Sequence, residues 1–151
     1  MKNLVNLKQN SHIKINNTTY EVLSKTSYMT MSSQDVYYKY ILTDHNILVV
    51  IPTDEVVYMG KIVEDFEQGL NFSQTITYEG NVYEQVASDY QVVKSVEYGN
   101  PQEVEGEVVW ADYQNEDIEQ TYISCAWVYK TNKRADIVGT MLTPEQIQLV
   151  D

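Results

Sequence analysis

Apolar and polar residues alternate along most of this 151-residue chain, and no other pattern restricts its fold as strongly. Successive side chains of a β-strand point to opposite faces, so a period of two places the apolar residues on one face. Apolar residues seldom recur at helical spacing for more than two turns. The alternation therefore predicts a mainly β protein.

Turn signals divide the first half of the chain into strands. Asn16-Asn17 tolerates the positive φ of a tight hairpin turn, and Asp44-His45-Asn46 is a second turn signal. The run Ile47–Ile51 is apolar at every position, which favours a central strand covered on both faces. The expected strands are 12–16, 19–28, 35–43, 47–51 and 56–63.

Residues 64–73 interrupt the alternation with three carboxylates, Gly69 and Asn71, which predicts a connection between two halves. The second half then begins like the first, with a hairpin expected at Gly80-Asn81. Its expected strands are 75–79, 82–86, 90–98, 104–112, 121–130 and 135–142.

Short similarities between the halves indicate an internal duplication. The segment 17–22, NTTYEV, resembles 80–85, GNVYEQ, at an offset of 63 residues, and Val57-Tyr58-Met59-Gly60 resembles Ile137-Val138-Gly139. We therefore expect a single domain, 1–151, with halves at about 7–65 and 74–150. Its predicted architecture is duplicated antiparallel β units, as tandem half-barrels or a sandwich.

A short C-terminal helix completes the predicted fold. Thr143 is a suitable N-cap, Pro144 favours the first helical position, and Gln146 completes a capping box. We expect this helix to run to about Val150 and to dock Ile147 and Val150 on the sheet.

Charge and composition limit the partners. The net charge of −12 repels phosphate backbones and anionic lipid, so we expect neither nucleic acid nor a membrane surface as a partner. The chain contains no apolar stretch typical of a signal peptide or a membrane span. Cys125 is the only cysteine, which fits a reducing compartment. The expected location is the cytoplasm.

Several segments resemble a bacterial family, domain-of-unknown-function family 4178. They are Ile13-Lys14-Ile15, 20–23 (YEVL) and 37–44 (YYKYILTD) in the first half, and 76–80 (ITYEG), 105–107 (EGE), 110–113 (WADY) and 137–139 (IVG) in the second. Tyr37, Tyr38 and Tyr40 stand where the family has a tryptophan-rich strand. The resemblance covers roughly residues 7–148 and implies a partner-binding role in a bacterial stress-response system. It carries over no catalytic residues.

The most unusual stretch is 103–119, which holds seven carboxylates and no Lys or Arg. In a strand, alternate carboxylates of this stretch share a face, which must be hydrated or meet a cation. It therefore forms either a charged edge that prevents aggregation or a surface for a cationic partner. We predict no calcium site, because the stretch lacks the glycine and ligand spacing of the familiar calcium loop.

Aromatic residues accompany these carboxylates. Ile123, Cys125, Trp127 and Tyr129 share one strand face and are expected in the core, with Cys125 an unreactive, buried thiol. Tyr113 and Tyr122 are expected at the surface, where tyrosine is a frequent hot-spot residue. The predicted partner-binding residues are Glu103, Glu105, Glu107, Asp112, Tyr113, Glu116, Asp117, Glu119 and Tyr122.

The sequence contains no nucleophile elbow, zinc-binding pair or phosphate-binding glycine motif. We therefore predict no catalytic residue, metal or cofactor, and expect the two histidines, His12 and His45, to be exposed at turns. The leading hypothesis is a non-catalytic protein-binding or adaptor module for a protein with a basic surface. The alternatives are a DNA-mimic inhibitor of a nucleic-acid enzyme and a small-ligand-binding β-barrel lined by Tyr and Trp.

Overall fold

The computed structural model describes residues 1–64, 66–100 and 107–150, without the side chains of residues 91–94. It confirms a mainly β protein, with strands and short 3-10 turns as its regular elements. The first half contains η1 (Lys2–Asn6), β1 (His12–Ile15), β2 (Thr18–Thr30), β3 (Val36–Leu42), η2 (Thr43–His45), β4 (Ile47–Ile51), η3 (Pro52–Asp54) and β5 (Val56–Ile62). The second half contains β6 (Thr75–Tyr78), β7 (Asn81–Tyr98), β8 (Val108–Gln114), β9 (Thr121–Val128), β10 (Lys133–Arg134), β11 (Ile137–Leu142), η5 (Pro144–Gln146) and β12 (Ile147–Leu149).

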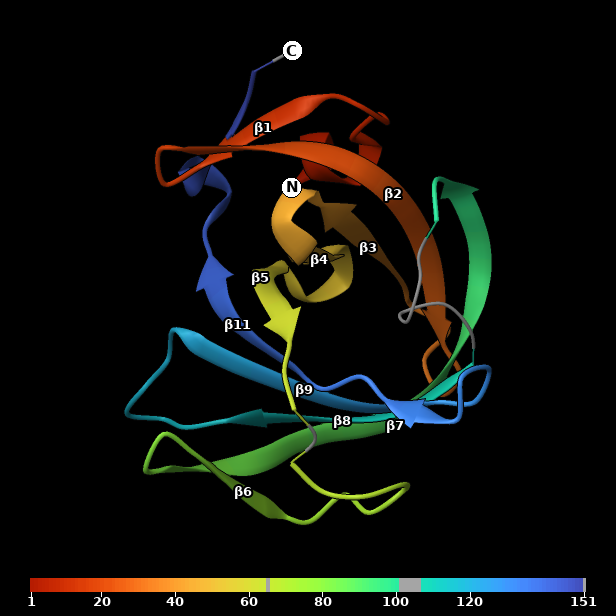
Figure 1. Ribbon diagram of the computed structural model, residues 1–151, viewed down its shortest axis with the longest axis vertical. Helices are drawn as coiled ribbons and strands as arrows, with labels where there is room; N and C mark the ends of the chain where they lie inside the picture. The colour runs from red at the N-terminus through yellow and green to blue at the C-terminus, as the bar shows by residue number, and fades with distance from the viewer. Residues whose placement is uncertain (65, 101–106, 151) are drawn as a thin grey trace.

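Both halves are antiparallel meanders with the same order of pairing. Strands β1 to β5 pair consecutively, and β6, β7, β8, β9 and β11 do the same. The halves join where β5 pairs with β11 and again where β2 pairs with β7. Pairing therefore runs in a ring through β2, β3, β4, β5, β11, β9, β8 and β7, while β12 and β6 remain at the two ends of the sheet (Figure 1).

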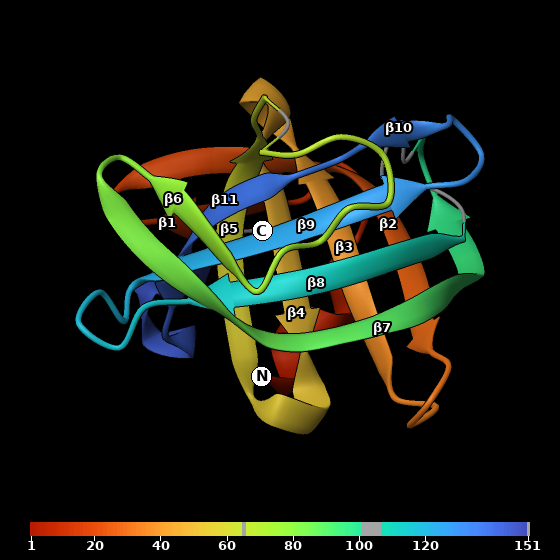
Figure 2. The ribbon, with the colours of Figure 1, turned by 90° about the horizontal axis from the view of Figure 1, so that it is seen from below.

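The two halves face each other as crossed layers. In Figure 2, β7, β8 and β9 run across the front of β3, β4 and β5 at a steep angle. Strand β2 is long and curved, and it pairs with β3 on one side and β7 on the other. Because the layers cross while their corners are joined, they enclose a space that side chains of both halves line.

Each half has a β-bulge at the same relative position. In the first half the register with β3 shifts between Val22 and Ser24, and in the second half the register with β8 shifts between Gln85 and Ala87. These two pairs of residues are 63 positions apart in the chain, the same offset as that of the similar sequences. A bulge bends its strand, so both halves bend at corresponding points.

Apolar clusters lie on both faces of the layers. One cluster packs β3, β4 and β5 against the N-terminal segment and β1, and includes Leu4, Ile13 and Leu48. A second cluster, with Val49 and Tyr58, lies on the opposite face of the same strands. Strand β4 contributes to both clusters, so the expected doubly covered central strand is confirmed.

The outer face of β8 and β9 is covered by the connection between the halves. Phe66 and Phe72 of this connection pack there against Tyr113, Ile123 and Cys125. A buried ion pair holds the connection in place: Arg134 donates to Asp136 and to the carbonyl oxygens of Gly69 and Asn71, and Asp136 accepts the backbone N–H of Phe66. The path of the connection over β8 and β9 is visible in Figure 2.

The predicted C-terminal helix is wrong. Only Pro144–Gln146 form a 3-10 turn, in which the Gln146 side chain accepts the backbone N–H of Thr143 at 2.8 Å. The chain then continues as β12, which pairs with β1 and places Ile147 opposite Ile15. Pairing with β1 provides hydrogen-bond partners for the backbone of β12 and buries Ile147, whereas Val150 is exposed.

Two smaller expectations also need correction. The second-half hairpin turns at Glu79 and Gly80, which both have positive φ, one residue before the expected pair. The expected strands 82–86 and 90–98 form the single long strand β7.

Within the described residues, no helix has the length and apolar character needed to cross a membrane.

Candidate ligand cavity

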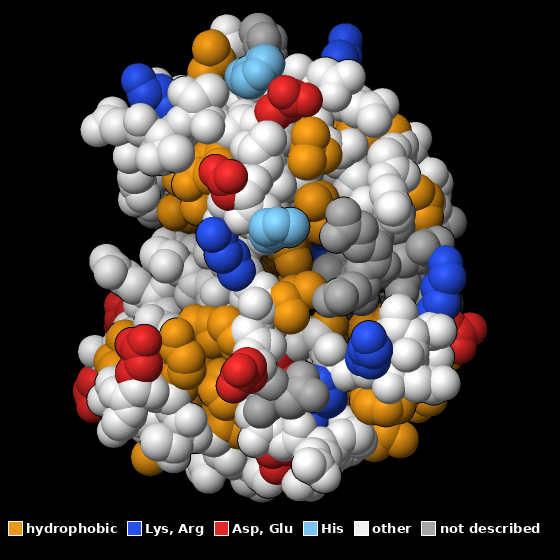
Figure 3. Space-filling view, viewed as in Figure 1, with side chains coloured by type: hydrophobic (Ala, Val, Ile, Leu, Met, Phe, Trp, Pro, Cys, Tyr) orange, Lys and Arg blue, Asp and Glu red, His pale blue; other side chains and the backbone are white. Residues whose placement is uncertain are grey.

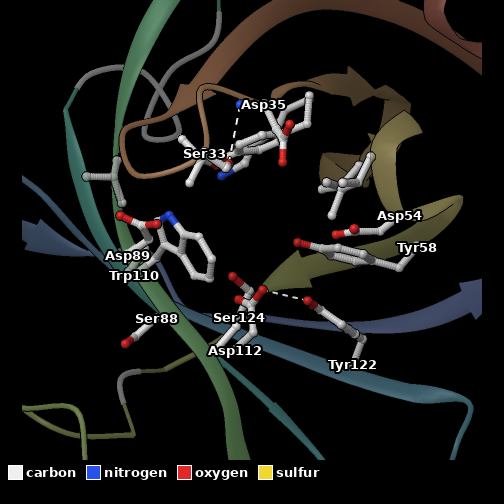
Figure 4. Close-up of a pocket in the computed structure, with 18 of the residues that line it drawn as sticks. Ser33, Asp35, Asp54, Tyr58, Ser88, Asp89, Trp110, Asp112, Tyr122 and Ser124 are labelled. Atoms are coloured by element: carbon white, nitrogen blue, oxygen red, sulfur yellow. Dashed lines mark hydrogen bonds between the residues drawn. The ribbon is translucent and has the colours of Figure 1, made fainter.

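A cavity of about 270 Å³ lies between the crossed layers. Strands β2, β3, β4, β5, β7, β8 and β9 all contribute side chains to it, together with the β2–β3 turn and η3 (Figure 4). Its volume is just below the range of roughly 300–1,000 Å³ that is typical of small-molecule sites, so it suits a small ligand. The following residues build its walls.

Asp112 is the most unusual residue of the wall. It is 8% exposed and lies on the inward face of β8, where Figure 4 shows it beside Ser124 and Tyr122. Its Oδ2 accepts a hydrogen bond of 2.5 Å from the Tyr122 hydroxyl. Its Oδ1 is buried without a hydrogen-bond partner in the described structure. A buried carboxylate oxygen without a donor is costly, so this atom is a candidate ligand contact.

Burial raises the pKa of Asp112 from 3.8 to about 6. The hydroxyls of Tyr122 and Ser124 and the charge of Lys39 oppose this rise. The carboxyl group is therefore ionised at neutral pH, but ionisation is much less favourable than in water.

Lys39 supplies a positive charge from the opposite layer. It lies on the inward face of β3, is 9% exposed and lines the cavity. Its Nζ lies 5.0 Å from the centre of the Tyr28 ring, and Lys39 forms no salt bridge with Asp112. Burial lowers the pKa of Lys39 from 10.5 to about 8, although the charge of Asp112 acts in the opposite direction. The ammonium group is thus charged at neutral pH.

Aromatic side chains form much of the remaining wall. Tyr58 of β5 stacks on Tyr122 of β9 with ring centres 4.6 Å apart, so one aromatic wall spans both halves. Trp110 of β8 points into the cavity (Figure 4), and its Nε1 is a buried donor without a partner in the described structure. Indole and phenol rings offer both apolar surface and attraction for cations.

The solvent-accessible part of the lining is polar and acidic. Ser33, Asp54 and Ser88 are exposed there, and the partly buried Asp35 and Asp89 lie beside them. The hydroxyl of Ser32 donates a hydrogen bond to the carboxylate of Asp89, which links the β2–β3 turn to β7. These three carboxylates in the lining make the cavity unfavourable for anions.

The predicted partner-binding residues do not form one surface in the structure. Glu103 and Glu105 lie outside the described residues. Glu107, Glu116, Asp117 and Glu119 are exposed, as expected. Glu107 accepts a hydrogen bond of 2.5 Å from the Tyr90 hydroxyl, while the other three line a shallow groove beside β7. On the face shown in Figure 3, carboxylates are spread among polar and apolar side chains.

Four expectations about side-chain exposure are wrong. Tyr113 is 0% exposed, because it packs under the connection and donates to the Ser73 carbonyl oxygen. Tyr122 and Asp112 are buried at the cavity instead of lying at the surface. Tyr129 was expected in the core, but it follows the end of β9 and is 40% exposed. The prediction that Cys125 is buried is confirmed.

Sequence reasoning missed Lys39 and Tyr58 as cavity residues. The sequence does contain a signal for Lys39, because this lysine shares a strand face with Tyr37 and Ile41. Lysine is rarely buried, so a lysine on an otherwise apolar face indicates a functional position. For Asp112 the signal was its face, which it shares with Val108 and Trp110. In the described part of the chain, no group of His, Cys, Asp and Glu side chains is arranged to hold a metal ion.

The fold and the cavity together define an antiparallel β protein with a charged, aromatic-lined interior. No protein-family model, curated protein or solved structure matches the chain. The resemblance to family 4178 therefore stays a prediction from the residues.

Proposed function

We propose that this protein is a binding module for a small polar organic molecule, which it holds in the cavity between its layers. The observation that carries the proposal is Oδ1 of Asp112, a buried acceptor of a cavity-lining residue (Figure 4) that has no hydrogen-bond partner among the described residues. Buried polar atoms in proteins nearly always have a partner, and a ligand donor would supply it here. The unpaired Nε1 of Trp110 offers a second, complementary contact.

The charges inside the cavity support the same function. Lys39 and Asp112 are both more than nine-tenths buried, and burial destabilises the charged form of each. A protein interior that only had to be stable would be better served by apolar residues of similar size. Unfavourable ionisable groups around a cavity are typical of a binding or reaction site.

The test uses the two tryptophans of the chain. Trp110 lines the cavity, whereas Trp127 lies on the opposite face of β9, so Trp127→Phe leaves a single indole that reports on the cavity. We expect a member of a library of small polar metabolites to change Trp110 fluorescence saturably and to raise the melting temperature. Isothermal titration calorimetry on the wild type then gives the dissociation constant.

Two matched pairs of variants locate the binding. Lys39→Met and Asp112→Asn change the cavity, and Lys133→Met and Asp117→Asn make the same changes at exposed positions. We expect at least tenfold weaker binding in the first pair and unchanged binding in the second. Equal affinity in all four variants, or no binding by any member of the library, would contradict the proposal.

A protein-binding surface is the second candidate function. The exposed Glu116, Asp117 and Glu119 line a groove together with the exposed apolar residues Val82 and Val86. Mixed acidic and apolar surface suits a partner with a basic surface, the role expected from the sequence. Affinity capture with the wild type and with a Glu116→Gln, Asp117→Asn, Glu119→Gln variant tests it. Loss of a specific protein in the variant would support this role, and identical captured proteins would count against it.

A further inference from the structure

We propose that the ligand is a small zwitterion whose carboxylate pairs with Lys39 and whose ammonium group pairs with Asp112. This inference rests on the binding function proposed above and specifies the chemical class of the ligand. It follows from the placement of two opposite charges that line one cavity and form no salt bridge with each other.

The two charges belong to different layers. Lys39 lies in the middle of β3, and Asp112 lies in β8, on the other side of the cavity. The Lys39 ammonium lies over the Tyr28 ring, and the cavity-lining Asp112 has a buried Oδ1 that accepts no hydrogen bond within the described structure. A molecule that carries both charges can satisfy both groups at once by lying between them.

The walls suit the rest of such a molecule. Next to Asp112, the stacked rings of Tyr58 and Tyr122 offer an aromatic surface that attracts an ammonium group. Val49, Val108 and Ala126 supply apolar surface for a short carbon skeleton. The Trp110 indole N–H is one further donor for a carboxylate oxygen.

Ligands with a single charge fit the cavity less well. A simple anion would face Asp112 across the cavity and would be repelled by the carboxylates of Asp35, Asp54 and Asp89, which also line it. A simple cation would leave the buried Lys39 ammonium without a counter-charge. A neutral polyol would supply hydrogen bonds but would compensate neither charge, and uncompensated buried charge is costly.

The test compares probes that differ in one charged group. Calorimetry with the wild-type protein measures binding of the free α-amino acids and the unbranched ω-amino acids of two to six carbons. Each zwitterion that binds is then compared with the amine that lacks its carboxylate, the acid that lacks its amino group and the amide of the same length. We expect at least one zwitterion to bind tenfold or more tightly than all three analogues.

Variants assign each charge to its residue. Asp112→Asn should remove the preference for the zwitterion over the matched acid, and Lys39→Met should remove its preference over the matched amine. Far-UV circular dichroism and melting temperature establish that each variant is folded. The comparison of zwitterions with their analogues uses only the wild-type protein, so it tests the inference even if a variant does not fold. Equal binding of zwitterion and analogues, or tighter binding of a singly charged or neutral compound, would overturn the inference and leave the binding function intact. If no compound of any class binds, both proposals fail.

Discussion

Gly60 and Gly139 lie directly opposite each other in β5 and β11, the pairing that joins the two halves. A Cβ atom on Gly60 would lie 2.3 Å from the carbonyl oxygen of Val138, and one on Gly139 would lie 2.8 Å from Cδ2 of Tyr58. The β11 backbone thus leaves no room for a side chain at Gly60, and the Tyr58 ring occupies the space that a side chain of Gly139 would need. This contact also sets Tyr58 against Tyr122 in the cavity wall.

Gly60→Ala should therefore destabilise the protein by roughly 1–3 kcal/mol, because the new methyl group collides with backbone that cannot rotate away. Gly139→Ala should cost less, since its nearest neighbour is a tyrosine side chain. Urea denaturation measures both changes. Thr140→Ala, at an exposed position of the same strand, is the control. Equal stability of Gly60→Ala and the control would show that the strands can separate without cost.

Arg134→Met should reduce stability by about 3–5 kcal/mol, because it leaves the buried Asp136 carboxylate without its counter-charge. It also removes the donors to Gly69 and Asn71, so the connection should become the first segment to exchange its amide hydrogens. Urea denaturation and hydrogen exchange provide the two measurements.

Lys133→Met is the matched control, since the neighbouring side chain is exposed. Protection of residues 66–73 that is unchanged in Arg134→Met would show that the phenylalanine packing alone holds the connection.

Asp112→Asn should stabilise the protein without ligand at neutral pH. The pKa of Asp112 is about 6 in the folded protein and 3.8 ordinarily, so the folded state holds this proton more tightly than the unfolded state does. The stability that comes from this proton is present below about pH 4 and is lost as the pH rises to about 6. The loss amounts to at most about 3 kcal/mol.

Unfolding free energies of the wild type and Asp112→Asn between pH 4 and pH 7.5 test this sign. Their difference should grow in favour of the variant as the pH rises, since the other carboxylates are common to both proteins. A constant difference would mean that the Asp112 carboxyl is not perturbed by burial.

Cys125 should not react with thiol reagents in the folded protein. It is 0% exposed, and burial raises the pKa of its thiol, so the reactive thiolate is scarce. Reaction with a disulfide reagent should therefore follow global unfolding, with full reactivity in guanidinium. Fast modification at a rate independent of stability would contradict the packing described here.

The strands were predictable because their signals are local. Asn16 and Asn17 adopt φ of 47° and 70°, as the hairpin turn requires, and the β3–β4 turn lies where Asp44 and His45 indicated it. The joining of the halves was not predictable, because alternation along a strand does not specify which distant strand pairs with it. The prediction of a C-terminal helix was wrong for a related reason. Its capping residues specify only the turn at 144–146, whereas pairing with the distant strand β1 makes the following residues a strand.

The cavity was only partly predictable. Tyrosine and tryptophan were expected to line a β-barrel interior if a ligand were bound, and Tyr58, Trp110 and Tyr122 do line the cavity. Asp112 was grouped with the surface carboxylates because it is close to them in sequence. Its strand face places it inside, and only the crossing of the layers shows that Lys39 lies across from it.

The corresponding bulges allow the lining of the two halves to be compared residue by residue. Just after the bulge, Ser24 of β2 pairs with Ile41 of β3, and Ala87 of β7 pairs with Asp112 of β8, so Ile41 and Asp112 occupy equivalent positions. Two residues earlier in β3 and β8, Lys39 and Trp110 are equivalent in the same way. Neither charged residue thus has a charged counterpart in the other half. At these four strand positions, a chain made of two first halves would carry two lysines and no carboxylate, and one made of two second halves would carry two carboxylates and no lysine. The opposite charges of Lys39 and Asp112 therefore stand at positions that do not correspond, and they would not occur together in a chain whose two halves were identical.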